Sequence, residues 1–149
     1  TEQALQKNLE TRRLAVKELQ NGGVVIIFPS GAISRAKRFV DKAVDPIWKK
    51  FVAKLATQSG TQVLPFFIEG QNTPIFQFAI QCSQTLGYSL MFREICKRMY
   101  RPVNIQMRPI ITEQMIADIN DRNKLIEKLR DITYFGVDKP PINMNKFSK

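Results

Sequence analysis

The apolar positions of the chain follow a helical period in three stretches. Residues 3–20 form the first stretch, and Asn21-Gly22-Gly23 directly after it is typical of the end of a helix. A second helix is expected over residues 48–55, with Ser59-Gly60 as its stop, and a final helix ends near Gly136. The apolar residues that mark these helices are Leu5, Leu9, Val16, Leu19, Trp48, Phe51, Val52, Leu55, Ile116, Ile119, Leu125, Ile126, Leu129 and Ile132.

Three shorter stretches have the pattern of strands. Residues 24–28 and 63–68 are nearly continuous apolar runs, and residues 103–107 alternate between apolar and polar. Residues 29–46 have the character of a loop, whereas residues 74–100 fit neither period clearly. Apolar strands that alternate with helices predict an α/β fold with a mixed, largely parallel sheet flanked by helices on both faces. We expect a single domain over residues 1–149.

Composition adds a bias toward anionic partners. The chain has 149 residues, 44% of them hydrophobic, which suits one globular domain, and its net charge is +10. No apolar run approaches the roughly 20 residues that span a bilayer, and the polar start of the chain does not resemble a signal peptide. Cys82 and Cys96 are too few for a disulfide framework or a zinc site, so free thiols are expected. The sequence contains no histidine.

The stretch "FPSGAISR" is the main candidate for chemistry, because it follows an apolar run directly. Pro29 stops a strand, Gly31 permits a tight turn, and Ser30 and Ser34 offer hydroxyl groups beside the guanidinium of Arg35, which suits phosphate. Residues 35–54 carry seven cations against two aspartates, a net charge of +5. A solvated basic loop is the simpler alternative, and the spacing of a P-loop is absent.

Two longer segments carry a resemblance to a known family. The sequences "GGVVIIFPSGAISRA" and "DPIWKKFVAKLATQSGTQVLPFFIEGQN" resemble the glycerophospholipid (lysophospholipid) acyltransferases, in particular the hemolysin-like branch that includes acyltransferases of ornithine-lipid synthesis. The third motif of that family, Phe-Pro-Glu-Gly-Thr-Arg-Ser, is matched at Phe28, Pro29 and Gly31. The fourth motif, an apolar strand with an internal proline, is matched at residues 63–66. The resemblance extends from about Leu14 to Ile110.

The resemblance implies an activity and a binding site. It implies transfer of an acyl group from acyl-CoA or acyl carrier protein to the hydroxyl of a lyso-lipid acceptor, without a further cofactor or metal. The acceptor head group would be bound by Phe28, Pro29, Ser30, Gly31, Ser34 and Arg35. Ser30 stands where the motif has glutamate, and Ala32-Ile33 stand where it has Thr-Arg, so the acceptor is expected to differ from ordinary lysophosphatidic acid.

The first motif of the family, His-x-x-x-x-Asp, is absent from this chain. In the family its histidine removes the proton from the acceptor hydroxyl. We therefore assign no catalytic residue, and we expect the chain to be the carboxyl-terminal part of a larger acyltransferase domain whose amino-terminal part supplies the base. The alternative is a catalytically inactive relative.

Residues 74–101 combine aromatic and aliphatic side chains with four cations, Arg93, Lys97, Arg98 and Arg101. An apolar surface rimmed by cations is typical of proteins that lie on an anionic membrane. We therefore expect a peripheral protein on an anionic membrane surface. Together with this expectation, the resemblance implies phospholipid biosynthesis at the cytoplasmic face of the membrane, with no nucleic-acid partner. A non-catalytic basic module that binds anionic lipid or nucleic acid is the alternative function.

Overall fold

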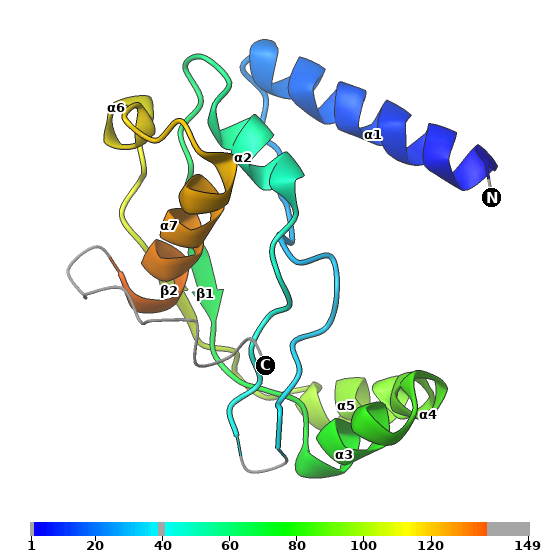
Figure 1. Ribbon diagram of the computed structural model, residues 1–149. Helices are drawn as coiled ribbons and strands as arrows, with labels where there is room; N and C mark the ends of the chain where they lie inside the picture. The colour runs from blue at the N-terminus through cyan, green and yellow to red at the C-terminus, as the bar shows by residue number, and fades with distance from the viewer. Residues whose placement is uncertain (1, 39–40, 137–149) are drawn as a thin grey trace. The chain divides into compact units, whose positions relative to one another are not determined.

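The structure is a computed structural model that describes residues 2–38 and 41–136. These residues contain seven α-helices and two short strands (Figure 1). The elements in chain order are α1 (Glu2–Gln20), α2 (Lys50–Ala56), β1 (Phe66–Ile68), α3 (Pro74–Cys82), α4 (Gln84–Ser89), α5 (Met91–Arg98), β2 (Ile105–Met107), α6 (Glu113–Ile116) and α7 (Arg122–Phe135).

The chain divides into two compact units. Among the described residues, the first unit contains residues 2–29, 48–67 and 107–136. The second contains residues 30–38, 41–47 and 68–106. The candidate acceptor loop and helices α3, α4 and α5 therefore belong to the second unit.

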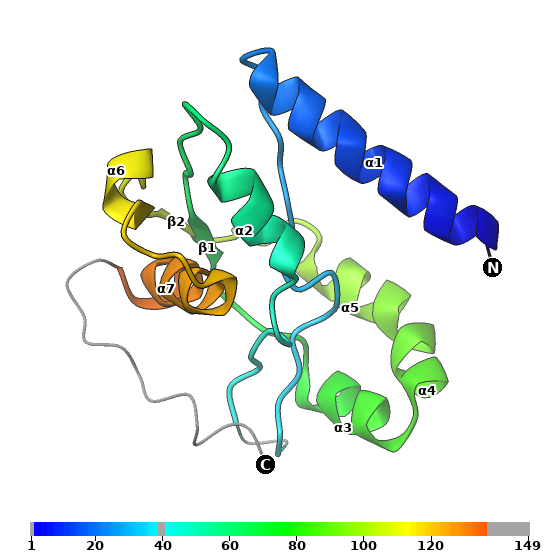
Figure 2. The same ribbon diagram turned by 45° about the horizontal axis from the view of Figure 1, so that its top comes forward.

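Helices α2 and α7 pack side by side and form the core of the first unit (Figures 1 and 2). Helix α7 begins where the carboxylate of Asp121 accepts a hydrogen bond from the Asn123 backbone N–H at 2.8 Å. It ends at Gly136, whose φ of 83° lies in the left-handed region. The buried core residues are Trp48, Val52, Ala53, Ala56, Ile111, Ile116, Leu125, Ile126, Leu129 and Ile132.

Strands β1 and β2 form an antiparallel pair. The ladder includes the hydrogen bond from Arg108 N–H to the Pro65 carbonyl at 2.9 Å. It continues to a bridge between Val63 and Ile111, which adjoins the core of the first unit. The ring of Phe67 packs against Tyr134 of α7, with 5.3 Å between ring centroids. The neighbouring side chains of the two strands are exposed hydrophobic residues: Phe66, Ile68, Ile105 and Met107.

The predicted α/β fold with a largely parallel sheet is wrong, because the described residues are mostly helical and pair two strands antiparallel. Residues 24–28 belong to no helix and no strand among the described residues. Three of their apolar side chains are largely in solvent: Val24 is 84% exposed, Ile26 85% and Phe28 76%. The buried strand predicted for this apolar run is therefore wrong.

The helix predictions have mixed outcomes. The first helix is confirmed as α1, although all its leucines are exposed or only half-buried. The second is confirmed as α2, which begins after Trp48. The predicted final helix is two helices, α6 and α7, because Asp121 caps a new start between them. The stretch without a clear period, residues 74–100, is helical almost throughout, as α3, α4 and α5.

Helices α3 and α4 of the second unit approach closely at Gly87. A Cβ atom placed on this glycine would lie 2.6 Å from the Cβ of Ile80, closer than real contacts allow. The absence of a side chain at Gly87 therefore permits the packing of α4 against α3.

We expect Leu129→Ala to lower the free energy of unfolding by about 2–5 kcal/mol, because it leaves a cavity in the core between α2 and α7. Urea unfolding followed by circular dichroism measures the loss. Leu5→Ala is the matched control, since Leu5 is exposed on α1. Equal unfolding midpoints for the two variants would contradict this description of the core.

A second prediction concerns Asp131 of α7. Burial, and then the negative charge of Glu127, raise the pKa of Asp131 above its usual 3.8, while Arg130 acts in the opposite direction. A raised pKa means that the folded state disfavours the ionised carboxylate, so the cost in stability develops as the pH rises from 3.8 and is complete once the pH exceeds the raised value.

Asp131→Asn should therefore stabilise the protein at neutral pH, and the gain should vanish below pH 3.8, where aspartate is protonated in both states. Urea unfolding at the two pH values measures this, and Asp118→Asn controls for the change in net charge. A gain of the same size at both pH values would refute the assignment.

Candidate functional site

Residues 30–38 and 41–47 form the two limbs of one loop in the second unit. Arg35 and Val44 face each other across it in an antiparallel bridge, and each donates its N–H to the other's carbonyl at 3.0 Å. Closer to the tip, the Arg38 N–H donates to the carboxylate of Asp41 at 3.2 Å. Residues 30–38 and 41–47 therefore have a defined backbone although neither limb contains a helix or a regular strand.

The loop is fixed to α3 at Ala36, which is buried. The Ala36 N–H donates to Oε1 of Gln77 at 3.0 Å, and its carbonyl accepts from Nε2 of Gln81 at 2.8 Å. On the other limb, the Ala43 N–H donates to Oε1 of Gln71 at 2.9 Å. Gln77 is itself almost fully buried, and its Nε2 has no hydrogen-bond partner. The three glutamine side chains thus supply hydrogen bonds that the backbone of a buried segment normally obtains from a neighbouring strand.

The two predicted serines are bonded within the loop. Ser30 is buried, and its Oγ donates to the Ala32 carbonyl at 2.9 Å, which closes a small turn around Gly31. Gly31 has a φ of 61°, in the left-handed region where glycine is favoured, so the turn expected there is confirmed. Oγ of Ser34 donates to the carboxylate of Asp45. Both hydroxyl groups therefore shape the loop.

Arg35 differs from the serines because its side chain is exposed while its backbone is held in the bridge to Val44. Phe28 and Pro29 belong to the first unit, where the Pro29 carbonyl accepts from the Lys49 N–H at 3.0 Å. Of the six residues predicted from the motif, the structure groups Ser30, Gly31, Ser34 and Arg35 in one loop. What this loop offers to a ligand is an exposed guanidinium on a fixed backbone.

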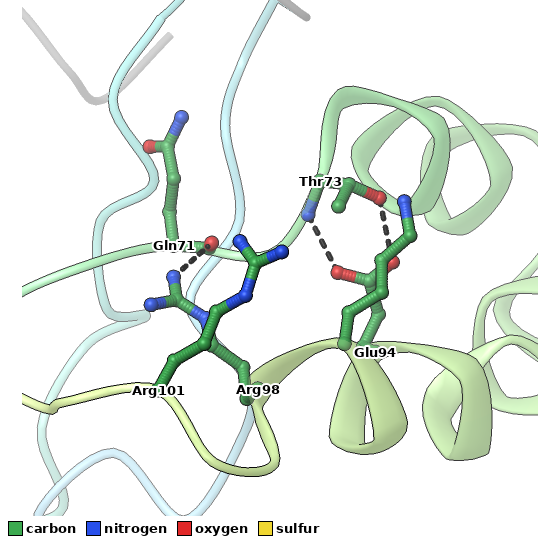
Figure 3. A pocket seen from close by; sticks show the side chains of 6 residues that line it. Gln71, Thr73, Glu94, Arg98 and Arg101 are labelled. Atoms are coloured by element: carbon green, nitrogen blue, oxygen red, sulfur yellow. Dashed lines mark hydrogen bonds between the residues drawn. The ribbon is translucent and has the colours of Figure 1, made fainter.

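A second cationic group in the same unit lines a hollow of about 330 Å³ beside α5 (Figure 3). The hollow is bounded by Gln71, Thr73, Glu94, Lys97, Arg98 and Arg101. The sequence analysis predicted that Lys97, Arg98 and Arg101 contact a membrane. It did not predict that the other three lining residues lie beside them. Thr73-Pro74 is a helix-start signal that could have placed Thr73 at the beginning of α3. Nothing in the sequence spacing could have paired it with Glu94.

A further basic hollow of about 340 Å³ lies between α1 and α2 of the first unit. The guanidinium of Arg12 lies over the ring of Phe51 there, 5.4 Å from its centroid. Leu9 and Val16 supply apolar lining, and the remaining cations are Arg13, Lys17 and Lys54.

The described residues contain no cluster of three or more histidine, cysteine, aspartate or glutamate side chains suited to a metal ion. Cys82 and Cys96 are exposed thiols. In the part of the chain that the structure describes, no helix has the length and apolar character needed to cross a bilayer.

Comparisons of the chain with protein-family models, curated proteins and solved structures find no match. The resemblance to the lysophospholipid acyltransferases therefore rests on the sequence motifs alone.

We expect Gln77→Leu to loosen the loop, because it removes the acceptor of the buried Ala36 N–H. An unsatisfied buried donor costs about 1–3 kcal/mol, so hydrogen exchange at the Ala36 amide should accelerate by about tenfold or more. Exchange followed by NMR measures the effect. Gln84→Leu is the control, since Gln84 is exposed and bonds only the hydroxyl of Tyr88 among the contacts described. An unchanged Ala36 amide would show that the glutamine does not hold the loop.

Proposed function

We propose that this chain is part of a lysophospholipid-type acyltransferase and supplies the site for the head group of the acyl acceptor. The observation that carries the proposal is Arg35, whose exposed guanidinium stands on a backbone fixed by the Val44 bridge and, one residue later, by Gln77 and Gln81. A guanidinium on a rigid support loses little conformational freedom when it binds a phosphate or another anionic head group.

The proposed reaction is acyl transfer from acyl-CoA or acyl carrier protein. The acceptor hydroxyl oxygen attacks the thioester carbonyl carbon, the carbon–sulfur bond breaks, and the hydroxyl proton passes to a general base. The chain contains no histidine, so the proposal takes this base from outside these 149 residues. The loop of Arg35 would hold the acceptor while the reaction takes place.

The proposal also places the protein at the cytoplasmic face of a membrane, as a peripheral protein, because lyso-lipids are membrane components. Phe92 and Ile95 of α5 support this location, since both are largely exposed on a helix that also carries cations. Exposed apolar side chains beside cations favour an anionic bilayer surface.

A second candidate function is a non-catalytic basic module that binds anionic lipid. One observation favours it: the hydroxyl groups of Ser30 and Ser34 are already bonded to the Ala32 carbonyl and to Asp45. A loop whose hydroxyls are engaged binds an anion mainly through its cations. The two functions differ in whether one cation, or the summed charge, determines binding.

We expect Arg35→Ala to weaken binding of a short-chain lysophosphatidic acid, used below its micelle concentration as a phosphate-bearing probe and not as the acceptor itself, by roughly ten- to a hundredfold. The reason is the loss of a charge-assisted hydrogen bond, which contributes about 1.5–3 kcal/mol. Isothermal titration calorimetry on the 149-residue chain measures the dissociation constant. Lys42→Ala is the matched control, because Lys42 is an exposed cation of the same loop.

The neutral monoacylglycerol of the same chain length should bind more weakly to the parent chain, since it lacks the phosphate. Equal losses from Arg35→Ala and Lys42→Ala would favour the basic module. Unchanged binding in Arg35→Ala would remove the site assignment altogether.

A further inference from the structure

We infer that the hollow beside α5 is a second anion site of this protein and binds a phosphate group between Arg98 and Arg101. This inference goes beyond the proposed acyl transfer and does not rest on it, because the residues concerned are distinct from those of the Arg35 loop.

The charge balance of the hollow favours an anion. Three cations, Lys97, Arg98 and Arg101, line it together with one carboxylate, that of Glu94. Glu94 is buried, and both its oxygens accept hydrogen bonds from Thr73: Oε2 from the backbone N–H at 2.7 Å and Oε1 from the hydroxyl at 2.5 Å. One carboxylate offsets one of the three cations, so the lining retains a net charge of +2.

The geometry brings two guanidinium groups to the same place. Nη2 of Arg98 donates to the Gln71 carbonyl at 2.9 Å, which fixes the position of that side chain. Figure 3 shows the side chain of Arg101 extending in the same direction, toward the segment that carries Gln71 and Thr73. Guanidinium groups gathered in this way repel one another, and an anion bound between them relieves the repulsion.

The backbone before Arg101 is adapted to this arrangement. Tyr100 has a φ of 60°, in the left-handed region that is unfavourable for a residue with a large side chain. Tyr100 is fully exposed, so its own packing does not account for this conformation. The conformation turns the chain directly after α5, and the Arg101 N–H bonds the Arg98 carbonyl at 3.1 Å.

A phosphate group suits the hollow in both shape and chemistry. The planar fork of arginine bonds two phosphate oxygens at once, and Lys97 adds a point charge. The volume of about 330 Å³ is ample for a phosphate that is part of a larger molecule. Two sources share this chemistry, namely the head group of an anionic phospholipid and a soluble phosphate ester.

The test measures binding of inorganic phosphate to the 149-residue chain by NMR titration of the arginine side chains. We expect Arg101→Gln to weaken the binding by about tenfold or more, since it removes a charge-assisted hydrogen bond. The control is Arg93→Gln, because Arg93 is an exposed cation of α5 that does not line the hollow, and it should change binding at most a few-fold. Both variants carry the same net charge.

Repeating the titration in an Arg35→Ala background separates this site from the loop, because the response to Arg101→Gln should persist there. Co-sedimentation with phosphatidylcholine vesicles, with and without phosphatidic acid, identifies the source. If the chain binds phosphatidic acid vesicles and Arg101→Gln abolishes this binding, the natural ligand of the hollow is a lipid head group. If the chain binds inorganic phosphate but not these vesicles, the natural ligand is a soluble phosphate ester. Equal losses in Arg93→Gln and Arg101→Gln, or no binding of either probe, would overturn the inference.

Discussion

The two hydrogen bonds at the backbone of Ala36 are the constraint on which the second unit depends. The described residues of the Arg35 loop, 30–38 and 41–47, have no helix and no regular strand to satisfy their backbone, yet Ala36 is buried. A buried N–H or carbonyl without a partner is costly, so the glutamines of α3 decide where this loop can lie. The turn at Ser30 and the bond from Ser34 to Asp45 then refine its shape locally. The position of Arg35 thus depends on its backbone bridge to Val44 and on the polar side chains that hold Ala36.

The two cationic centres of the second unit are built differently. Arg35 lies on a loop in solvent, where its charge is screened by water and salt. Arg98 and Arg101 gather near a buried carboxylate, whose removal from water is offset by the donors of Thr73. Part of the positive charge of the chain is therefore found at two sites, the Arg35 loop and the hollow beside α5. The geometry of the hollow depends on Thr73 at the start of α3, which bonds Glu94.

Local features of this fold were predictable from the sequence, and long-range pairings were not. Helices α1 and α7 follow from apolar spacing and a glycine stop, which act over one or two turns, and the core positions Val52 and Leu129 follow from the same spacing. Pairing of β1 with β2 depends on where three intervening helices return the chain, and no periodicity contains that information. The loop of Arg35 was predictable because a proline and a glycine mark it. The contact of Thr73 with Glu94 joins residues far apart in the sequence, so only the folded chain places it.

The exposed apolar side chains of Val24–Phe28 affect the behaviour of the protein in concentrated solution. Val24, Ile26 and Phe28 alternate along it with more than three quarters of each side chain exposed, and these residues belong to no strand among those described. An exposed, apolar, β-branched stretch outside any described strand can serve as a template for strand addition by another polypeptide. Lysines of α1 lie close in sequence but do not interrupt the stretch, so no charge within it opposes intermolecular stacking. This segment is consequently the point from which self-association and aggregation of the isolated chain would begin.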